Sequence, residues 1–131
     1  MRITIPVSAG ELIDKLTILN VKVERLTAPE KLQNVAHELR LLEAVRTATL
    51  PELADLAGLE ARLHEVNARL WDIEDAKRAC EKAAEFGPEF IELARLVYIL
   101  NDERADLKRQ INLIVGSEII EEKSHSSSGA H

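Results

Sequence analysis

The sequence predicts an all-α fold, a four-helix antiparallel bundle, and three observations lead to it. A hydroxyl residue stands three positions before a glutamate at Ser8–Glu11, Thr27–Glu30 and Thr49–Glu52, which is a helix-start signature. Gly87–Glu89, with a proline between the glycine and the glutamate, marks a fourth start. After each start, apolar residues recur at alternating spacings of three and four, as they do along the core-facing stripe of a bundle helix.

The first half of the chain predicts a short helical hairpin. One helix is expected over residues 9–26 and a second over residues 29–48. Almost no loop separates them, so the two helices must run antiparallel. The core-facing stripe of the first helix consists of Leu12, Leu16, Leu19, Val23 and Leu26.

The second half predicts a longer hairpin, with helices over residues 51–86 and 88–115 and Gly116 as a left-handed terminating residue. At 1.5 Å per residue these helices are roughly 40 Å long, against about 28 Å for the first two. The short hairpin therefore cannot cover the far end of the long one. We expect a homodimer with coiled-coil-like packing, in which a second copy covers Ala83, Ala84, Phe86 and Phe90.

The two ends of the domain carry weaker signals. Residues 2–7 alternate apolar and polar side chains, and residues 118–123 contain two adjacent isoleucines. Both ends of an up-down-up-down bundle reach the same side, so these segments could pair as a short two-stranded ribbon. Residues 1–123 are expected to form a single domain, and the Ser-rich residues 124–131 a disordered tail.

Composition excludes several classes of function. A net charge of −6 and only four aromatic residues argue against nucleic-acid binding. Neither a signal-peptide core nor a run of membrane-spanning length is present, so we expect a cytoplasmic protein that does not insert into membranes. Cys80 is the single cysteine, and no Glu-x-x-His pair, phosphate loop or His-Glu-x-x-His motif occurs. We therefore expect no metal and no cofactor.

Polar residues interrupt the apolar stripes of the long hairpin. Arg104 and Lys77 each occupy a position where leucine would serve a core. Counting along the helices brings Arg104 level with polar residues of the other three helices. A buried ion-pair layer that fixes helix register is one interpretation, and a ligand or catalytic pocket is the other. The candidate layer comprises Arg104, Glu74, Glu38, Asn67, Asn20 and Trp71.

Three stretches of sequence support a family resemblance. Residues 5–19 read Ile-Pro-Val-Ser-Ala-Gly-Glu-Leu-Ile-Asp-Lys-Leu-Thr-Ile-Leu, residues 70–74 read Leu-Trp-Asp-Ile-Glu, and further matching segments lie between residues 90 and 123. In these stretches the chain resembles a family of small bacterial proteins of unknown function. The resemblance implies an association with gene clusters for surface polysaccharides, and it implies no activity or catalytic residues.

These observations favour a non-enzymatic helical adaptor or binding module that self-associates, and a further protein partner fits the same interpretation. The long apolar stripes and the bare hairpin end support it. The alternative is an enzyme or binder of a small molecule, a nucleotide or a sugar phosphate, that uses the polar layer around Arg104. Whether the protein is an enzyme is left open by the sequence.

Overall fold

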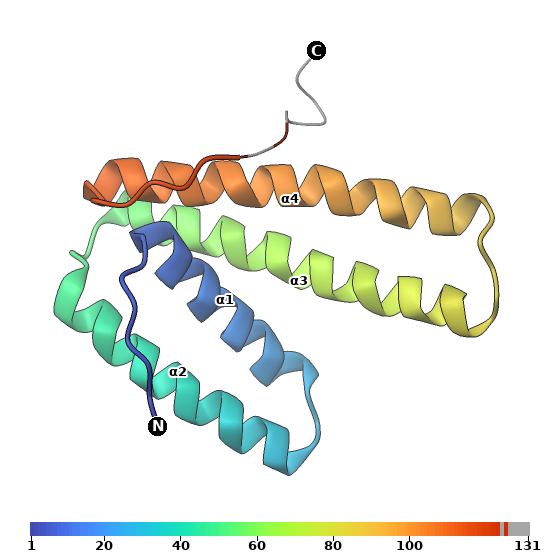
Figure 1. Cartoon of the computed structure of the whole chain (residues 1–131), viewed down its shortest axis with the longest axis horizontal. Coiled ribbons are helices and arrows are strands. Elements are labelled where there is room, and N and C mark those ends of the chain that lie inside the picture. Colours follow the sequence, from blue (N-terminus) through green and yellow to red (C-terminus); the bar gives the residue numbers. More distant parts are fainter. Residues whose placement is uncertain (124, 126–131) are drawn as a thin grey trace.

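A computed structural model describes residues 1–123 and 125, and within them the chain is all-α (Figure 1). The four-helix antiparallel prediction is confirmed. Of the predicted disordered tail, residues 124–131, all but His125 lie outside the described residues. The helices are α1 (Ala9–Arg25), α2 (Pro29–Thr49), α3 (Ala54–Lys82) and α4 (Pro88–Val115).

The helices form two hairpins of unequal length that diverge from a common end (Figure 1). Helices α3 and α4 make the long hairpin, and α1 and α2 make the short one. Helix α1 lies in the middle and contacts the other three, whereas α2 closely approaches α1 alone. The link from α2 to α3 is an ion pair, in which Arg46 donates to both carboxylate oxygens of Glu60 at 2.7 and 2.5 Å.

The apolar core is built by α1, α3 and α4. Ile13 and Leu16 of α1 are almost fully buried, and only Val35 of α2 is buried. Helix α2 instead lays half-buried leucines against the edge of the core. Because α1 shares a face with every other helix, its position determines how the two hairpins meet. The other apolar residues with exposed fractions of at most 2% are Val21, Leu56, Leu63, Leu100, Leu107 and Ile111.

One of the three hydroxyl caps forms as predicted. The backbone amide of Glu11 donates to the Ser8 hydroxyl at 3.0 Å. The other two predicted caps are wrong: α2 follows Ala28 with no side-chain cap, and α3 begins only at Ala54. Thr49 remains inside α2 because its hydroxyl donates to the carbonyl of Val45, four residues earlier.

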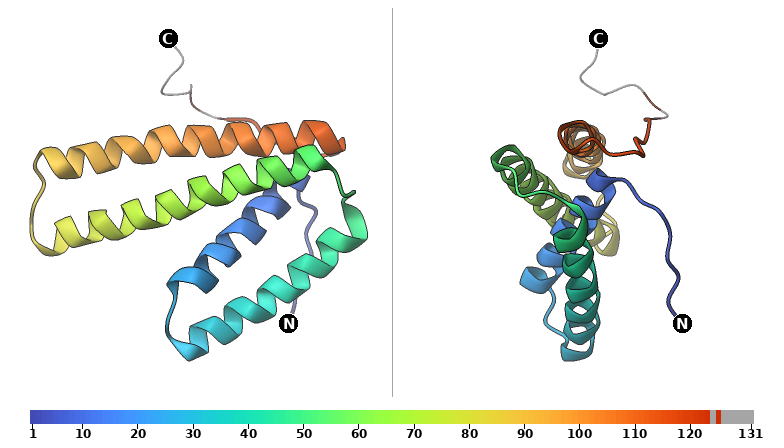
Figure 2. Two further views of the ribbon diagram at one scale, coloured as in Figure 1. Left: turned by 180° about the vertical axis from the view of Figure 1, so that it is seen from behind. Right: turned by 90° about the vertical axis from the view of Figure 1, so that its left-hand side faces the viewer.

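The terminal segments do not pair, and no residue in the described ranges belongs to a strand. Residues 1–7 are exposed and stand apart from the helices (Figure 2). Residues 117–123 lie along α4, held by ion pairs from Glu122 to Arg109 and from Lys123 to Asp106. The predicted ribbon is therefore absent, because the C-terminal segment is fastened to side chains of α4 instead.

Beyond α1, the long hairpin continues as two helices only. Arg25, the last residue of α1, pairs with Asp72 of α3 at 3.1 Å. We call residues 73–98, past this contact, the arm. Cys80 is buried between its two helices, and the rings of Phe86 and Phe90 pack edge to face near its tip, with centroids 5.4 Å apart. No helix in the described part of the chain is both long and apolar enough to cross a membrane.

Candidate functional site

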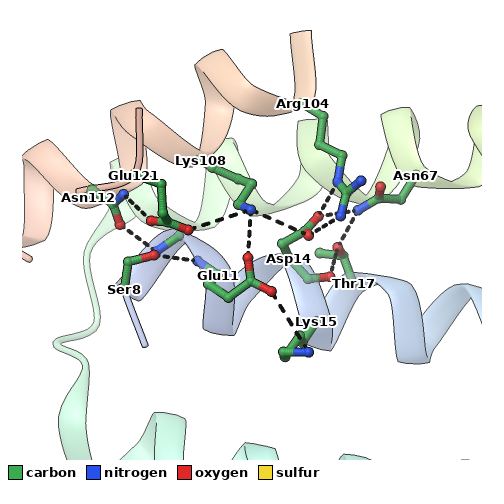
Figure 3. A network of polar contacts seen from close by, with 11 residues as sticks. Ser8, Glu11, Asp14, Lys15, Thr17, Asn67, Arg104, Lys108, Asn112 and Glu121 are labelled. Atoms are coloured by element: carbon green, nitrogen blue, oxygen red, sulfur yellow. Dashed lines mark hydrogen bonds and ion pairs between the residues drawn. The ribbon is translucent and has the colours of Figure 1, made fainter. Parts of the chain in front are cut away.

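The Asp14 carboxylate is the centre of a buried polar network (Figure 3). Its side chain is only 1% exposed. Arg104 binds it through two nitrogens, with Nε 2.9 Å from Oδ1 and Nη2 2.5 Å from Oδ2. Asn67 Nδ2 donates to the same Oδ1 at 2.9 Å and to the Thr17 hydroxyl. A bidentate, hydrogen-bonded pair of this kind is the geometry in which a buried charge is tolerated.

A close approach of α1 to α4 makes this network possible. A Cβ added to Gly10 would lie 2.5 Å from the carbonyl oxygen of Lys108, so only glycine fits there. The Gly10 amide donates to Asn112 Oδ1 at 2.6 Å. One turn later on α1, the short side chain of Asp14 reaches Arg104 across this narrow contact.

Lys108 extends the network to the C-terminal segment. Its Nζ lies 2.6 Å from Glu11 Oε2 and 3.8 Å from Glu121 Oε2. Partial desolvation acts to raise the pKa of Glu121, but hydrogen bonds from Ser8 and from the backbone, together with the charge of Lys108, lower it overall. The ionised carboxylate of Glu121 therefore helps to fasten this segment against α1 and α4.

Arg104 is charged throughout the pH range in which a protein folds. Its hydrogen bond to Asp14 raises the pKa of the guanidinium, and this outweighs the opposing effect of desolvation. The Arg104 guanidinium therefore does not act as a proton donor.

The structure brings Arg104 and Asn67 together through Asp14, which sequence reasoning missed. A signal for it was present, because Gly10, Asp14 and Thr17 fall on one stripe of α1 at spacings of four and three. Small and polar residues on a stripe flanked by leucines indicate a close helix contact with hydrogen bonds.

The other predicted members of the layer make no hydrogen bond or ion pair with Arg104 among the described residues. Glu74 pairs with Lys77 at 3.4 Å and does not contact Arg104. Asn20 donates to the carbonyl of Leu16 in its own helix. Glu38 is exposed, because α2 leans away from α3 and α4, so its placement in the layer is corrected.

Trp71 and Glu74 share a groove with Arg104 and Asn67, between the two hairpins. We call this hollow, of about 550 Å³, the hairpin groove. Its lining consists of Ile18, Val21, Leu26, Lys31, Asn67, Leu70, Trp71, Glu74, Asp75, Arg78 and Arg104.

Metal-ligating side chains do not converge in the part of the chain that the structure describes, where no three His, Cys, Asp or Glu residues could hold an ion together. His64, which shares a face with Glu60, lies 3.1 Å from Glu24 of α1. The chemistry available at the candidate site is therefore that of arginine, carboxylate, amide and indole groups.

The comparison with family models identifies the family to which the chain is similar. The model of DUF6165, a family of unknown function, matches residues 1–129. The chain belongs to this family. The predicted membership of an uncharacterised family is thus confirmed. No curated protein and no solved structure matches the chain.

Proposed function

We propose that the protein is a non-enzymatic helical binding module that self-associates through its arm. The observation that carries the proposal is a set of exposed apolar side chains beyond the reach of α1 and α2. Phe86 is 50% exposed, Ile91 55% and Tyr98 69%. Ile91 and Tyr98 are seven residues apart and lie on one face of α4, opposite the face that packs on α3.

A second copy of the chain is the occupant that the charges favour. The tip of the arm is acidic, with Glu81, Glu85, Glu89 and Glu92 against Lys82 alone. Its root is weakly basic, with Lys77, Arg78 and Arg95 against Glu74 and Asp75. Two arms packed antiparallel about a two-fold axis place each acidic tip beside the basic root of the other. The same packing covers the apolar faces of both arms.

As part of the same proposal, the protein acts in the cytoplasm of a bacterium. The family resemblance connects the protein with surface-polysaccharide gene clusters, so a protein of polysaccharide assembly is the first partner class to test. The self-associated module would act there as an adaptor, presenting two copies of each binding surface.

Light scattering across micromolar concentrations tests the self-association. The wild-type chain should reach twice the monomer mass, and Ile91→Lys combined with Tyr98→Lys should remain monomeric. Leu113→Lys is the matched control, because Leu113 lies on the same helix, outside the arm, and is 59% exposed. A wild-type monomer at every concentration, or equal loss of the dimer in the control, would refute the proposal.

A second candidate function is small-molecule binding beside Arg104. The hairpin groove favours it, because this hollow combines an aromatic ring with cationic side chains. Its volume falls within the range of about 300–1,000 Å³ typical of ligand sites.

A further inference from the structure

The hairpin groove offers cationic hydrogen-bond donors that the fold does not use. Arg104 holds Asp14 through Nε and Nη2, and its Nη1 has no hydrogen-bond partner among the described residues. In Figure 3 this nitrogen points away from Asp14. Lys31 and Arg78 likewise form no ion pair within the part of the chain that is described. Three cationic groups from three different helices therefore line one groove.

Two other hollows lack this feature. The hollow between α2 and α3 is lined by Arg46, which is already held by Glu60 through two hydrogen bonds. The hollow beneath the C-terminal segment is lined by Lys108 and Arg109, and both are paired with glutamates of that segment. At either place an anion would have to displace the carboxylate that holds the cation, whereas in the hairpin groove only Arg104 is held by a carboxylate, and Lys31 and Arg78 form no ion pair among the described residues.

The groove also offers a ring surface and hydrogen-bond acceptors. Trp71 is half-buried in its wall, next to the apolar side chains of Ile18 and Leu70. Asn67 donates its Nδ2 to Asp14 and Thr17, which leaves Oδ1 as an acceptor. Glu74 and Asp75 add carboxylates. A tryptophan face suits the C–H face of a sugar ring, and carboxylate or amide oxygens accept from sugar hydroxyls.

We infer that the hairpin groove binds a sugar phosphate, an inference that rests on the second candidate function. Arg78, Lys31 and Arg104 Nη1 would hold the phosphate, and Trp71 would pack on the sugar ring. Asp14 already neutralises Arg104, and Glu74 and Asp75 balance Lys31 and Arg78, so charge alone does not favour a simple anion in the groove. Free phosphate would meet the repulsion of both carboxylates, whereas sugar hydroxyls donate to them and turn that repulsion into binding.

The fluorescence of Trp71 provides a site-specific measurement, because it is the single tryptophan of the chain. Titration of the full chain with glucose 1-phosphate should change the emission saturably. Glucose alone and inorganic phosphate alone should each require concentrations at least about tenfold higher, because each lacks one set of charge-assisted or ring contacts.

A matched pair of arginine variants tests the location. Arg78→Ala should raise the Kd for glucose 1-phosphate by about tenfold, the usual effect of removing one charge-assisted hydrogen bond. Arg78 is exposed and unpaired among the described residues, so the variant should fold normally. Arg69→Ala is the control, because Arg69 is an exposed arginine of the same helix that does not line the groove.

The possible outcomes distinguish failure of the sugar-phosphate inference from failure of the second candidate function, small-molecule binding. If neither glucose 1-phosphate nor AMP changes the emission at millimolar concentrations, both the inference and the second candidate function fail. A response to AMP without one to glucose 1-phosphate overturns the sugar-phosphate class and leaves small-molecule binding in place. Equal affinity for inorganic phosphate, or equal weakening by Arg69→Ala, overturns the proposed contacts.

Discussion

The two halves of α4 lie in opposite environments. Toward its C-terminus, Arg104, Lys108 and Asn112 form hydrogen bonds or ion pairs with α1. Every buried side-chain nitrogen and oxygen among the described residues has a partner. Toward its N-terminus, in the arm, Ile91 and Tyr98 are apolar and exposed. Exposed apolar side chains occur in both halves, since Leu113 near the C-terminus is 59% exposed, so it is the buried polar groups held by α1 that distinguish the C-terminal half from the arm.

This difference indicates that the two halves of α4 have different roles in the fold. A buried ion pair adds little net stability compared with apolar residues, but it is costly to break, so it penalises alternative registers. If α1 slid by one turn, Asp14 would lose Arg104 and Asn67 together. The network therefore selects a single position for α1. The arm has no such constraint, which leaves its apolar face available to a partner.

Breaking the network should have the largest effect. Arg104→Leu leaves the buried Asp14 carboxylate without its bidentate partner and should lower the free energy of unfolding by about 3–5 kcal/mol. The double variant Asp14→Leu with Arg104→Leu should recover most of this loss. Urea unfolding followed by circular dichroism measures both.

Glu74→Ala is the control for the network, because Glu74 forms only a half-exposed pair with Lys77. Its effect should remain below about 1 kcal/mol. A loss for Glu74→Ala equal to that of Arg104→Leu would show that the register depends on another contact than Asp14.

A matched pair of glycines tests the close approach of α1 to α4. Gly10→Ala places a methyl group against the Lys108 carbonyl and should destabilise by about 1–3 kcal/mol. Gly58→Ala, in α3 with nothing within 4 Å of the added Cβ, should stabilise by roughly 0.5–1 kcal/mol. Thermal unfolding of the two variants should therefore shift in opposite directions, and shifts of the same sign would contradict the contact.

The helices could be predicted from the sequence because their signals are local. Apolar spacing and the Ser8 cap located α1, and Pro88 and Gly116 marked both ends of α4. The start of α3 was predicted three residues early, at Pro51, since a threonine three residues before a glutamate occurs inside helices as well as before them. Such a signature cannot show whether the hydroxyl bonds forward to an amide or backward to a carbonyl.

The partners in the site were less predictable, because they depend on the angle between the hairpins. Counting along the α3–α4 hairpin puts Arg104 near Leu70, and in the structure Arg104 and Asn67 both bind Asp14. The same counting assumed that α1 and α2 stand parallel to it. They diverge from it instead. Glu38 is therefore exposed and outside the layer, and Asp14 of α1 is the residue that contacts Arg104.

The contact of Glu121 in the C-terminal segment with Lys108 should make a smaller, pH-dependent contribution to the free energy of unfolding. The lowered pKa of Glu121 means that its contribution is present above the unfolded pKa, about 4.3, and is lost as pH falls through the folded value. Glu121→Gln should cost less than about 1 kcal/mol at neutral pH, because the side chain is 45% exposed and solvent screens the pair. The difference from wild type should vanish in acid.

Urea unfolding of wild type and Glu121→Gln at several pH values measures this effect. Glu118→Gln, an exposed glutamate of the same segment, should leave the pH profile unchanged. If the gap between wild type and Glu121→Gln persisted in acid, the contact would act through packing and not through charge.

The smallest effect on folding is expected in the arm. Ile91 is 55% exposed and lies on the face of α4 that no other helix covers, so Ile91→Lys should change the stability of the monomer by no more than about 0.5 kcal/mol. Urea unfolding at protein concentrations below the dissociation constant of the proposed dimer isolates this intramolecular term. At higher concentration the wild type should gain stability by mass action while the variant does not. If Ile91→Lys destabilised the isolated monomer as much as Gly10→Ala does, the arm would be part of the folded core, and the contrast between the two halves of α4 would disappear.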